Sequence, residues 1–402
     1  MIHVLHLISS FGLSGGGAEA NLLRHVQHMD RSRFRSTVVT MTDVFDSNGT
    51  GPIQSLLGRS EVSFHSLGMK LGVPNPLAAI RLSRIIRQSQ PEVLMTWMYP
   101  ADLLGLLVGR ATNIPSICWY LQCSELAGPG FGWMQRMVRR VLISLSSLPD
   151  VVMANSWSGL EFHRALGYTP RKWLYMPNTI DLDLFKPDEQ ARGWLRSILR
   201  LPAQTQLIGL LARFHLMKDH QTFIKAAGLL AAENSEAHFV LAGIGVEEDN
   251  ASIHTMVKAT GAAGRFHLLG ARLDINRITA ALDIACSSSN RGEGTSNSLA
   301  EAMACAVPCV ATDVGDSAFM IHNTGRIVPP KDPQSFARAC RELLDLSLEK
   351  RRQLGLFARQ RVTELFSFES VVAKYQELYE QLARTPEPRQ KVNDRTSTTQ
   401  TT

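Results

Sequence analysis

Short runs of apolar residues recur along the chain, and longer stretches between them repeat their apolar positions at helical spacing. Continuous apolar runs of this length are typical of strands buried on both faces of a parallel sheet. We interpret as strands the runs IHVLHLI, STVVTMT, EVLMTW, SICWYL and DVVMANS in the first half, and QLIGLLA, AHFVLAG, RFHLLG, DIACSSS, PCVATDV and GRIVPP in the second. The intervening stretches predict amphipathic helices, among them residues 19–29, 77–90, 221–233 and 334–346.

The alternation of strand and helix stops around residues 180–205 and then restarts. This break predicts two doubly wound α/β domains, an N-terminal one at residues 1–184 and a C-terminal one at residues 185–364. A chain of 402 residues that is 45% hydrophobic is long and apolar enough for two cores. The polar, Pro-containing end, residues 383–402, is expected to be disordered.

The net charge of +6 is spread along the chain, since residues 1–184 carry 16 Lys and Arg against 12 Asp and Glu. This charge is too diffuse for a nucleic-acid interface, although it would favour anionic lipid or a phosphorylated substrate. The six cysteines form no C-x-x-C pair, so we expect reduced thiols and no disulfide or zinc framework. A basic leader and a long uncharged apolar run are both missing, and we therefore expect a cytoplasmic protein that is at most peripheral to a membrane.

Polar residues with chemical potential follow the predicted strands, where ligands bind in open α/β sheets. Three glycines at residues 15–17 follow the first strand, and Glu19 lies in the first turn of the next helix. The backbone amides of Gly16 and Gly17 could approach a phosphate closely. A flexible strand–helix turn explains the same stretch about as well, because the spacing is not G-x-G-x-x-G.

Two basic residues, Arg213 and Lys218, follow the first strand of the second half. A guanidinium makes planar bidentate bonds to phosphate oxygens and an ammonium acts as a compact charge, so together they could hold a diphosphate. Lone cations in loops are more often simply solvated. The motif alone therefore leaves both interpretations open.

Two glutamates eight positions apart, Glu293 and Glu301, surround a small polar loop. Thr295 or Ser296 can cap a helix that begins near Asn297, which puts Glu301 on its second turn and Glu293 in the preceding loop. Carboxylates accept hydrogen bonds from paired hydroxyls, and an open helix N-terminus offers N–H groups to an anion. These features together fit a nucleotide sugar, with backbone groups contributed by Gly294, Thr295, Asn297, Ser298 and Leu299.

Consecutive motifs of the chain resemble signatures of the family 4 retaining glycosyltransferases, which have the GT-B fold. They include GGAEANLLRHV, YMPNTIDLDLFKP, LLARFHLMKDH and EGTSNSLAEAMACAVPCVATDVGDSAFMI, and the resemblance runs in order from about residue 1 to 382. It implies two Rossmann-like domains that face a central cleft. It also implies that a closing helix at residues 365–382 returns to complete the N-terminal domain.

The resemblance assigns roles to the candidate residues. The position of Glu301 binds the ribose hydroxyls, that of Glu293 lies at the sugar hydroxyls, and Arg213 and Lys218 neutralise the diphosphate. Arg213, Lys218 and Glu293 are thus the expected catalytic residues, and the amides of Gly16 and Gly17 approach from the other domain. The expected reaction is transfer, with retention, from a nucleotide diphosphate donor such as a UDP-sugar to a saccharide or lipid-linked acceptor. No metal or other cofactor is expected.

One departure from the family pattern keeps an alternative open. Many members carry a histidine after the strand that here reads SICWYL, whereas this chain has Gln122 there and Glu125 nearby. Glutamine cannot act as a base near neutral pH. The alternative function is therefore a partner protein that binds nucleotide sugars without turnover.

Three further motifs receive less weight. The sequence DLD at residues 181–183 imitates a two-aspartate metal site but lies in the interdomain link. Gly243-Ile-Gly245 follows a strand but lacks the third glycine of a dinucleotide site, so an NAD enzyme is a distant alternative. A basic amphipathic helix within residues 130–148 could lie on an anionic membrane, although an ordinary domain helix is favoured. Its predicted apolar side holds Met134, Met137, Val138, Val141, Leu142 and Leu145, opposite Arg136, Arg139 and Arg140.

Overall fold

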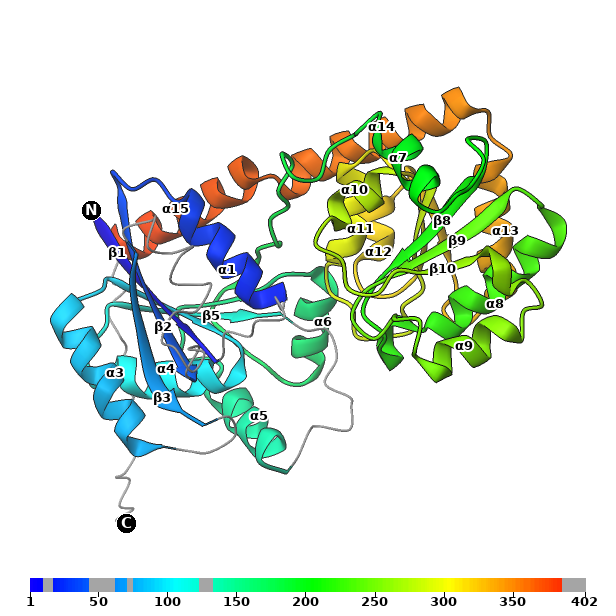
Figure 1. Ribbon diagram of the computed structural model, residues 1–402. Helices are drawn as coiled ribbons and strands as arrows, with labels where there is room; N and C mark the ends of the chain where they lie inside the picture. Colours follow the sequence, from blue (N-terminus) through cyan, green and yellow to red (C-terminus); the bar gives the residue numbers. More distant parts are fainter. Residues whose placement is uncertain (10–16, 43–61, 71–74, 123–132, 385–402) are drawn as a thin grey trace, which may run out of the picture.

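The computed structural model describes residues 1–9, 17–42, 62–70, 75–122 and 133–384. They form two domains, each built on a parallel sheet with helices on both faces (Figure 1). The predicted α/β class with two doubly wound domains is confirmed. Three predicted features, Gly16, Glu125 and most of the C-terminal tail, lie outside the described residues.

The N-terminal sheet has seven parallel strands in the order β3-β2-β1-β4-β5-β6-β7. Helices α1 and α15 (Phe368–Arg384) cover one face of the sheet over a core that includes Val26 and Tyr375. Helices α3, α4 and α5 cover the other face over a core that includes Leu82 and Leu142. The strands are β1 (Ile2–Ile8), β2 (Phe34–Thr42), β3 (Ser63–Met69), β4 (Val93–Trp97), β5 (Ser116–Leu121), β6 (Val151–Ala154) and β7 (Trp173–Tyr175). The helices are α1 (Gly17–His28), α3 (Pro76–Ser89), α4 (Tyr99–Ala111), α5 (Trp133–Leu145) and α6 (Trp157–Ala165).

The C-terminal sheet has six parallel strands in the order β10-β9-β8-β11-β12-β13. The strands are β8 (Gln206–Leu211), β9 (Ala237–Ala242), β10 (Phe266–Leu268), β11 (Ile284–Ser287), β12 (Cys309–Thr312) and β13 (Gly325–Val328). The helical elements are α7 (Ala191–Ile198), η1 (Leu216–Lys218), α8 (His220–Glu233), α9 (Ala251–Lys258), η2 (Ala263–Arg265), α10 (Ile275–Ala280), α11 (Asn297–Ala304), α12 (Ser317–Ile321), α13 (Pro333–Leu344) and α14 (Leu348–Phe366).

The apolar runs identified in the sequence correspond to β1, β2, β4 to β6 and β8 to β13. The strands β3 and β7 were not predicted, and both lie at the edges of the N-terminal sheet. An edge strand is only half covered, so it needs no continuous apolar run. The half-exposed sequence SFHSLGM of β3 and the three residues of β7 fit that position.

The chain crosses between the domains twice. The first crossing follows β7, and the second lies between α14 and α15 (Phe368–Arg384), where the two helices run almost end to end (Figure 1). The backbone N–H of Ile180 donates to the carbonyl of Phe366 at 2.9 Å, which joins the two crossings. Beyond this point α15 packs on α1, β1 and β4, so the last described helix belongs to the N-terminal core.

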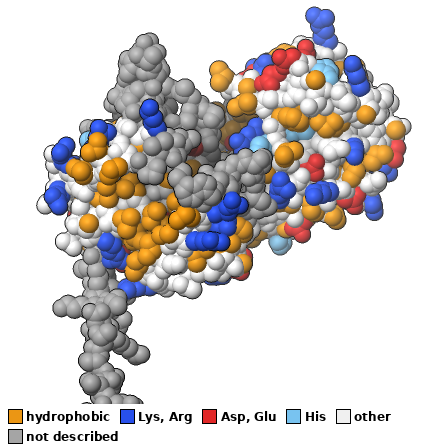
Figure 2. Space-filling model, turned by 90° about the horizontal axis from the view of Figure 1, so that it is seen from below, with side chains coloured by type: hydrophobic (Ala, Val, Ile, Leu, Met, Phe, Trp, Pro, Cys, Tyr) orange, Lys and Arg blue, Asp and Glu red, His pale blue; other side chains and the backbone are white. Residues whose placement is uncertain are grey.

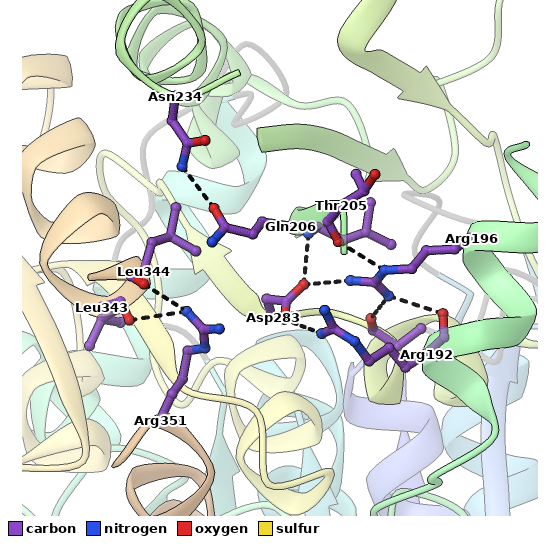
Figure 3. A network of polar contacts seen from close by, with 11 residues as sticks. Arg192, Arg196, Thr205, Gln206, Asn234, Asp283, Leu343, Leu344 and Arg351 are labelled. Carbon is purple, nitrogen blue, oxygen red and sulfur yellow. Dashed lines mark hydrogen bonds and ion pairs between the residues drawn. The ribbon is translucent and has the colours of Figure 1, made fainter. Parts of the chain in front are cut away.

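A buried ion pair fixes the start of the C-terminal domain to its sheet. The guanidinium of Arg196 on α7 donates to Asp283 at 2.6 Å and to the carbonyl of Thr205 at 2.8 Å (Figure 3). Asp283 also accepts from the N–H of Leu207 in β8 and pairs with Arg192. Because both partners of the Arg196–Asp283 pair are about 2% exposed, removing one charge would leave the other buried and unpaired.

Both sheets reverse their strand order at one point, between β1 and β4 and between β8 and β11. Loops that leave the strands at such a point form the ligand site of open α/β sheets. In the C-terminal domain these are the loop after β8, which holds Lys218, and the loop after β11, which holds Glu293. The topology therefore places these two loops where a ligand site is expected.

Candidate active site

Lys218 ends the short helix η1, which is held in place by the neighbouring loop. His215 caps η1 by accepting the N–H of Met217, and Asn290 binds the backbone of Leu216 and Met217 through its side chain and its N–H. The hydroxyl of Ser288 donates to the carbonyl of Lys218 at 2.8 Å. The loop after β11 thus fixes the backbone from which the side chain of Lys218 extends.

Glu293 lies directly beside Lys218. Its carboxylate accepts from the ammonium of Lys218 and, at 2.5 Å, from the hydroxyl of Ser289. The side chain of Glu293 is 9% exposed and that of Lys218 is 22% exposed, so the ion pair is largely shielded from water. The sequence-based prediction gave these two residues to different parts of the donor, whereas in the structure they form one charged pair.

Glu301 lies on the second turn of α11, as the sequence predicted, because the helix begins at Asn297. Burial raises the pKa of Glu301, and the positive charges of Arg24 and Lys218 act in the opposite direction. The carboxylate of Glu301 therefore interacts electrostatically with a cation of each domain. The N–H groups in the first turn of α11 have no partner within the helix, as in any α-helix, and are available to an anion.

The predicted capping of α11 is wrong in detail. Ser296 occupies the N-cap position but makes no side-chain bond to the backbone of the first turn, and its hydroxyl lies 3.4 Å from that of Ser298. The hydroxyl of Thr295 instead donates to the carbonyl of Asn155 in the other domain at 2.6 Å. A contact between domains has therefore replaced a local one.

The loop between Glu293 and α11 packs against the N-terminal domain. A Cβ atom at Gly294 would lie 2.8 Å from the hydroxyl oxygen of Ser156, so a larger residue would require Ser156 or the loop to shift. The amide of Asn178 donates to the side-chain oxygen of Asn297 at 3.2 Å. Leu299 is buried in the C-terminal core, so only its backbone can contribute to a site.

Asp316, in the loop after β12, caps a helix of the opposite domain. Its carboxylate accepts the N–H groups of Trp157 and Ser158 at 2.8 and 2.9 Å, at the start of α6. The N–H of Asp316 donates to the carbonyl of Gly294, which ties this cap to the loop that carries Glu293. The sequence gave no signal for this contact, because an aspartate caps a helix that precedes it by 159 positions.

Three cations act electrostatically on one histidine in the loop after β8. Desolvation and the positive charges of Arg213, Lys218 and Arg291 lower the pKa of His215. Arg213 and Lys218, which the sequence singled out, therefore act on the same side chain, and Arg291 acts on it too. The guanidinium of Arg24 on α1 donates to the carbonyl of Thr179 at 3.1 Å and acts on Glu301 from the other domain.

The predicted N-terminal residues are only partly described. Gly17 is the first residue of α1, and Gly16 lies outside the described residues, as does Glu125. Gln122 follows β5 at its carboxyl end. Its side-chain nitrogen is buried and has no hydrogen-bond partner among the described residues, so it is poised to donate to a group that enters there.

A hollow of about 460 Å³ lies elsewhere, beside the link between the domains. Asp183, Lys186, Asp188 and Arg277 line it, and the charged cluster around Lys218 does not. The carboxylate of Asp181 accepts two N–H groups of its own turn, as a turn-forming aspartate does. We place the candidate site at Lys218, Glu293 and Glu301, because opposite charges and free helix N–H groups meet there.

Comparison with known proteins matches each domain to a glycosyltransferase family model. The family model described as Glycosyltransferase Family 4 matches residues 15–184, and the one described as Glycosyl transferases group 1 matches residues 205–346. A GDP-mannose-dependent alpha-(1-6)-phosphatidylinositol monomannoside mannosyltransferase of Mycobacterium tuberculosis is 26% identical over 387 residues, which cover 93% of this chain and 97% of that protein.

Solved structures agree on the fold. Anabaena Alr3699/HepE in complex with UDP has a TM-score of 0.79 at 20% identity, and the match covers 94% of this chain and all of that one. Sucrose-phosphate synthase from Thermosynechococcus elongatus has a TM-score of 0.78 at 19% identity, with 94% and 99% covered. With its two matched domains in the order and arrangement of the GT-B fold, this chain belongs to the family 4, group 1 glycosyltransferases.

Proposed function

We propose that the protein transfers a sugar, with retention of anomeric configuration, from a nucleotide diphosphate donor to a hydroxyl of a saccharide or lipid-linked acceptor. The observation that carries the proposal is the juxtaposition of Lys218, Glu293 and Glu301 at the strand-order reversal of the C-terminal sheet. Hydroxyl-binding carboxylates and phosphate-binding cations are both needed for a nucleotide sugar.

Uridine is our choice for the base of the donor. The structural neighbour HepE is described in complex with UDP and with UDP-glucose, and this supports a UDP-sugar. The mycobacterial relative is described as dependent on GDP-mannose. The first experiment therefore measures thermal shifts with UDP-glucose and GDP-mannose side by side, since a ligand at 100 times its Kd adds about 2.7 kcal/mol of stability.

The proposed chemistry assigns a task to each charged group. As the bond between the anomeric carbon and the diphosphate oxygen breaks, negative charge develops on the leaving group, and Lys218 and Arg213 stabilise it. Glu293 orients the ammonium of Lys218 and accepts from a sugar hydroxyl, while Glu301 accepts from the ribose hydroxyls. The acceptor hydroxyl attacks from the face that the diphosphate leaves, and a leaving-group oxygen takes its proton.

Retention is supported by the side chain that occupies the place of a base. An inverting enzyme needs a general base near the acceptor, on the face opposite the leaving group. The carboxyl end of β5 offers the amide of Gln122, which cannot accept a proton near neutral pH. Proton NMR of fresh product reports the anomeric coupling, and an inverted linkage would contradict this part of the proposal.

We further propose that no divalent metal takes part, because Arg213 and Lys218 supply positive charge at the diphosphate. Turnover is expected to persist in excess chelator. Inactivation by chelator that a divalent ion reverses would contradict the proposal and direct attention to Asp181 and Asp183.

The alternative function, a partner that binds nucleotide sugars without turnover, predicts a different outcome. A partner protein of this kind would also be stabilised by the nucleotide sugar, but it would release no nucleotide with any acceptor. Nucleotide release that depends on a saccharide or lipid-linked acceptor is the result that our proposal requires.

A further inference from the structure

Helices α3, α4 and α5 form one layer on the N-terminal sheet. The outer helices α3 and α5 both pack against α4, and the layer buries side chains such as Leu82, Leu106 and Leu142 in one core. The other surface of these three helices, which we call the α3–α5 face, points away from the sheet. Figure 2 views the molecule from this side, and hydrophobic side chains gather there with Lys and Arg beside them.

The α3–α5 face carries charge of one sign. The three helices contain seven arginines and a single acidic residue, Asp102. Asp102 is completely buried, and burial raises its pKa well above the ordinary value, which favours its neutral form. The arginines are Arg81, Arg84, Arg87, Arg110, Arg136, Arg139 and Arg140.

Most of these arginines have no acidic partner. Among the described residues, no ion pair involves the three arginines of α5 or Arg84 and Arg87 of α3. Arg81 and Arg110 instead donate to backbone carbonyls. Within the described part of the chain, five of the seven arginines of the face therefore have no ion-pair partner.

Large apolar side chains stand among the arginines. Leu77 and Ile80 on α3, Leu107 on α4 and Met137 on α5 are each more than half exposed, and Val141 is 40% exposed. On the helices that cover the opposite side of the sheet, α1 and α15, the described residues include no exposed large hydrophobic side chain. Exposed large apolar side chains are thus more frequent on the α3–α5 face than on α1 and α15.

The structure also corrects the predicted geometry of α5. The single apolar side expected from the sequence divides, because Leu142 is buried in the core while Met137 and Val141 face outward beside Arg136 and Arg140. Arginines next to exposed apolar side chains can extend their charged ends past them toward phosphate groups. The outward side of α5 therefore carries both apolar and basic side chains.

We propose that the α3–α5 face docks on the surface of an anionic lipid membrane. Arginines attract anionic headgroups, and the apolar side chains between them can enter the interface. A second copy of the chain fits less well, because a symmetric interface would bring two acid-free basic surfaces together. Among the described residues, no helix is long and apolar enough to cross a bilayer, so the proposed contact is peripheral.

Vesicle flotation tests the proposal without use of the transfer reaction, so its outcome is independent of the function proposed above. The full chain is mixed with vesicles of neutral phosphatidylcholine or of phosphatidylcholine with 30% phosphatidylglycerol. Binding to the anionic vesicles only, reduced at high salt, is expected. Equal binding to both, or to neither, would overturn the proposal.

Matched variants locate the contact. Arg136→Glu with Arg140→Glu is expected to weaken vesicle partition about 25-fold or more, at roughly fivefold for each lost arginine. The control pair, Lys258→Glu with Arg338→Glu, makes the same change of net charge on exposed positions of the C-terminal domain and is expected to bind almost as the wild type does. Equal losses in the two pairs would show that only net charge matters and would overturn the proposed face.

The apolar part of the face has its own control. Leu107→Asp is expected to weaken partition at least fivefold, while Leu273→Asp, at a fully exposed loop position of the other domain, causes a smaller loss. Size-exclusion chromatography tests whether a second copy of the chain covers the face instead. A dimer that Leu107→Asp dissociates would assign the face to a second copy of the chain and contradict the membrane proposal.

Discussion

At the scale of single residues, the ion pair of Lys218 and Glu293 determines how charge is arranged around the proposed donor. The carboxylate of Glu293 pairs with the ammonium of Lys218 and holds it near the loop that follows β11. When a diphosphate enters, Lys218 can bind its oxygens without a large movement. Preorganised charge of this kind contributes more to catalysis than charge that must be recruited during the reaction.

We expect Lys218→Ala and Arg213→Ala each to lower kcat by about 10² to 10³, comparable to the loss of one oxyanion donor. Lys225→Ala, at an exposed position of α8, is the control and should retain normal turnover. Steady-state kinetics at saturating donor make the measurement. Near-normal kcat in both site variants would show that the diphosphate binds elsewhere.

The sequence singled out the candidate site residues but could not predict how they pair. Arg213, Lys218, Glu293 and Glu301 stand out because they follow strands or open a helix, and the structure gathers them at one reversal of strand order. The partnership of Lys218 with Glu293 depends on η1, whose backbone is held by Ser288 and Asn290 some 70 positions later. Local spacing carries no information on such a contact.

At the scale of secondary-structure elements, Asp316 and α6 couple the two domains. An acceptor carboxylate at a helix N-terminus satisfies free N–H groups and interacts favourably with the helix dipole. Here the helix and its cap belong to different domains. Their separation would leave both the carboxylate and the N–H groups of Trp157 and Ser158 without these partners.

Asp316→Ala is therefore expected to lower the unfolding free energy by about 0.5–2 kcal/mol, as the loss of a helix cap does, and also to lower the transfer rate. Asp332→Ala is a matched control, because Asp332 caps α13 within the C-terminal domain by accepting the N–H of Ser335 at 3.0 Å. Thermal melts and kinetics on both variants are compared. If Asp332→Ala slows transfer as much as Asp316→Ala does, the cap between domains has no special role.

Strands that are covered on both faces were predicted from the sequence, whereas the less buried strands at the edges of the N-terminal sheet were not. Strands such as β4 and β5 are buried at every position and largely apolar, because both of their faces are covered. The edge strands β3 and β7 lack that signal, and the contact of Thr295 with Asn155 could not be foreseen because it joins different domains. Patterns in the sequence report local burial, while contacts between domains require the fold.

At the scale of the whole molecule, α15 attaches the end of the described chain to the N-terminal domain through a buried aromatic cluster. Tyr379 on α15 lies 3.1 Å from the ring nitrogen of His25 on α1, and Tyr375 lies against the same ring. Burial lowers the pKa of His25 to about 3. Protonation of this ring would oppose the packing of α15.

We expect the protein to lose stability as the pH falls below about 6.5. The unfolded chain takes up protons on histidine near that pH, whereas the buried His25, His163 and His220, with pKa values of about 3, 4 and 4, stay neutral. The unfolded state then binds more protons than the native state, so acid favours unfolding until the native pKa values are reached. Stability from this source is fully present above pH 6.5.

Thermal melts between pH 7.5 and 4.5 test this expectation. Each buried histidine contributes up to about 1.4 kcal/mol per pH unit in that window. His25→Gln removes one titrating group and should flatten the dependence, whereas His28→Gln, at an exposed position on the same helix, should not. A Tm that is constant from pH 7 to 5 would contradict the assignment of neutral buried histidines.

Calorimetric titration of UDP and GDP into the wild type, Glu301→Gln and Glu293→Gln tests the central claim most directly, because the two carboxylates are proposed to serve opposite ends of the donor. We predict that the wild type binds UDP and that Glu301→Gln weakens this affinity about tenfold or more, as the loss of a charged hydrogen-bond acceptor does. Glu293→Gln should bind UDP almost as the wild type does but transfer sugar slowly. Equal losses of affinity in the two variants, or a wild type that binds neither nucleotide, would contradict the account.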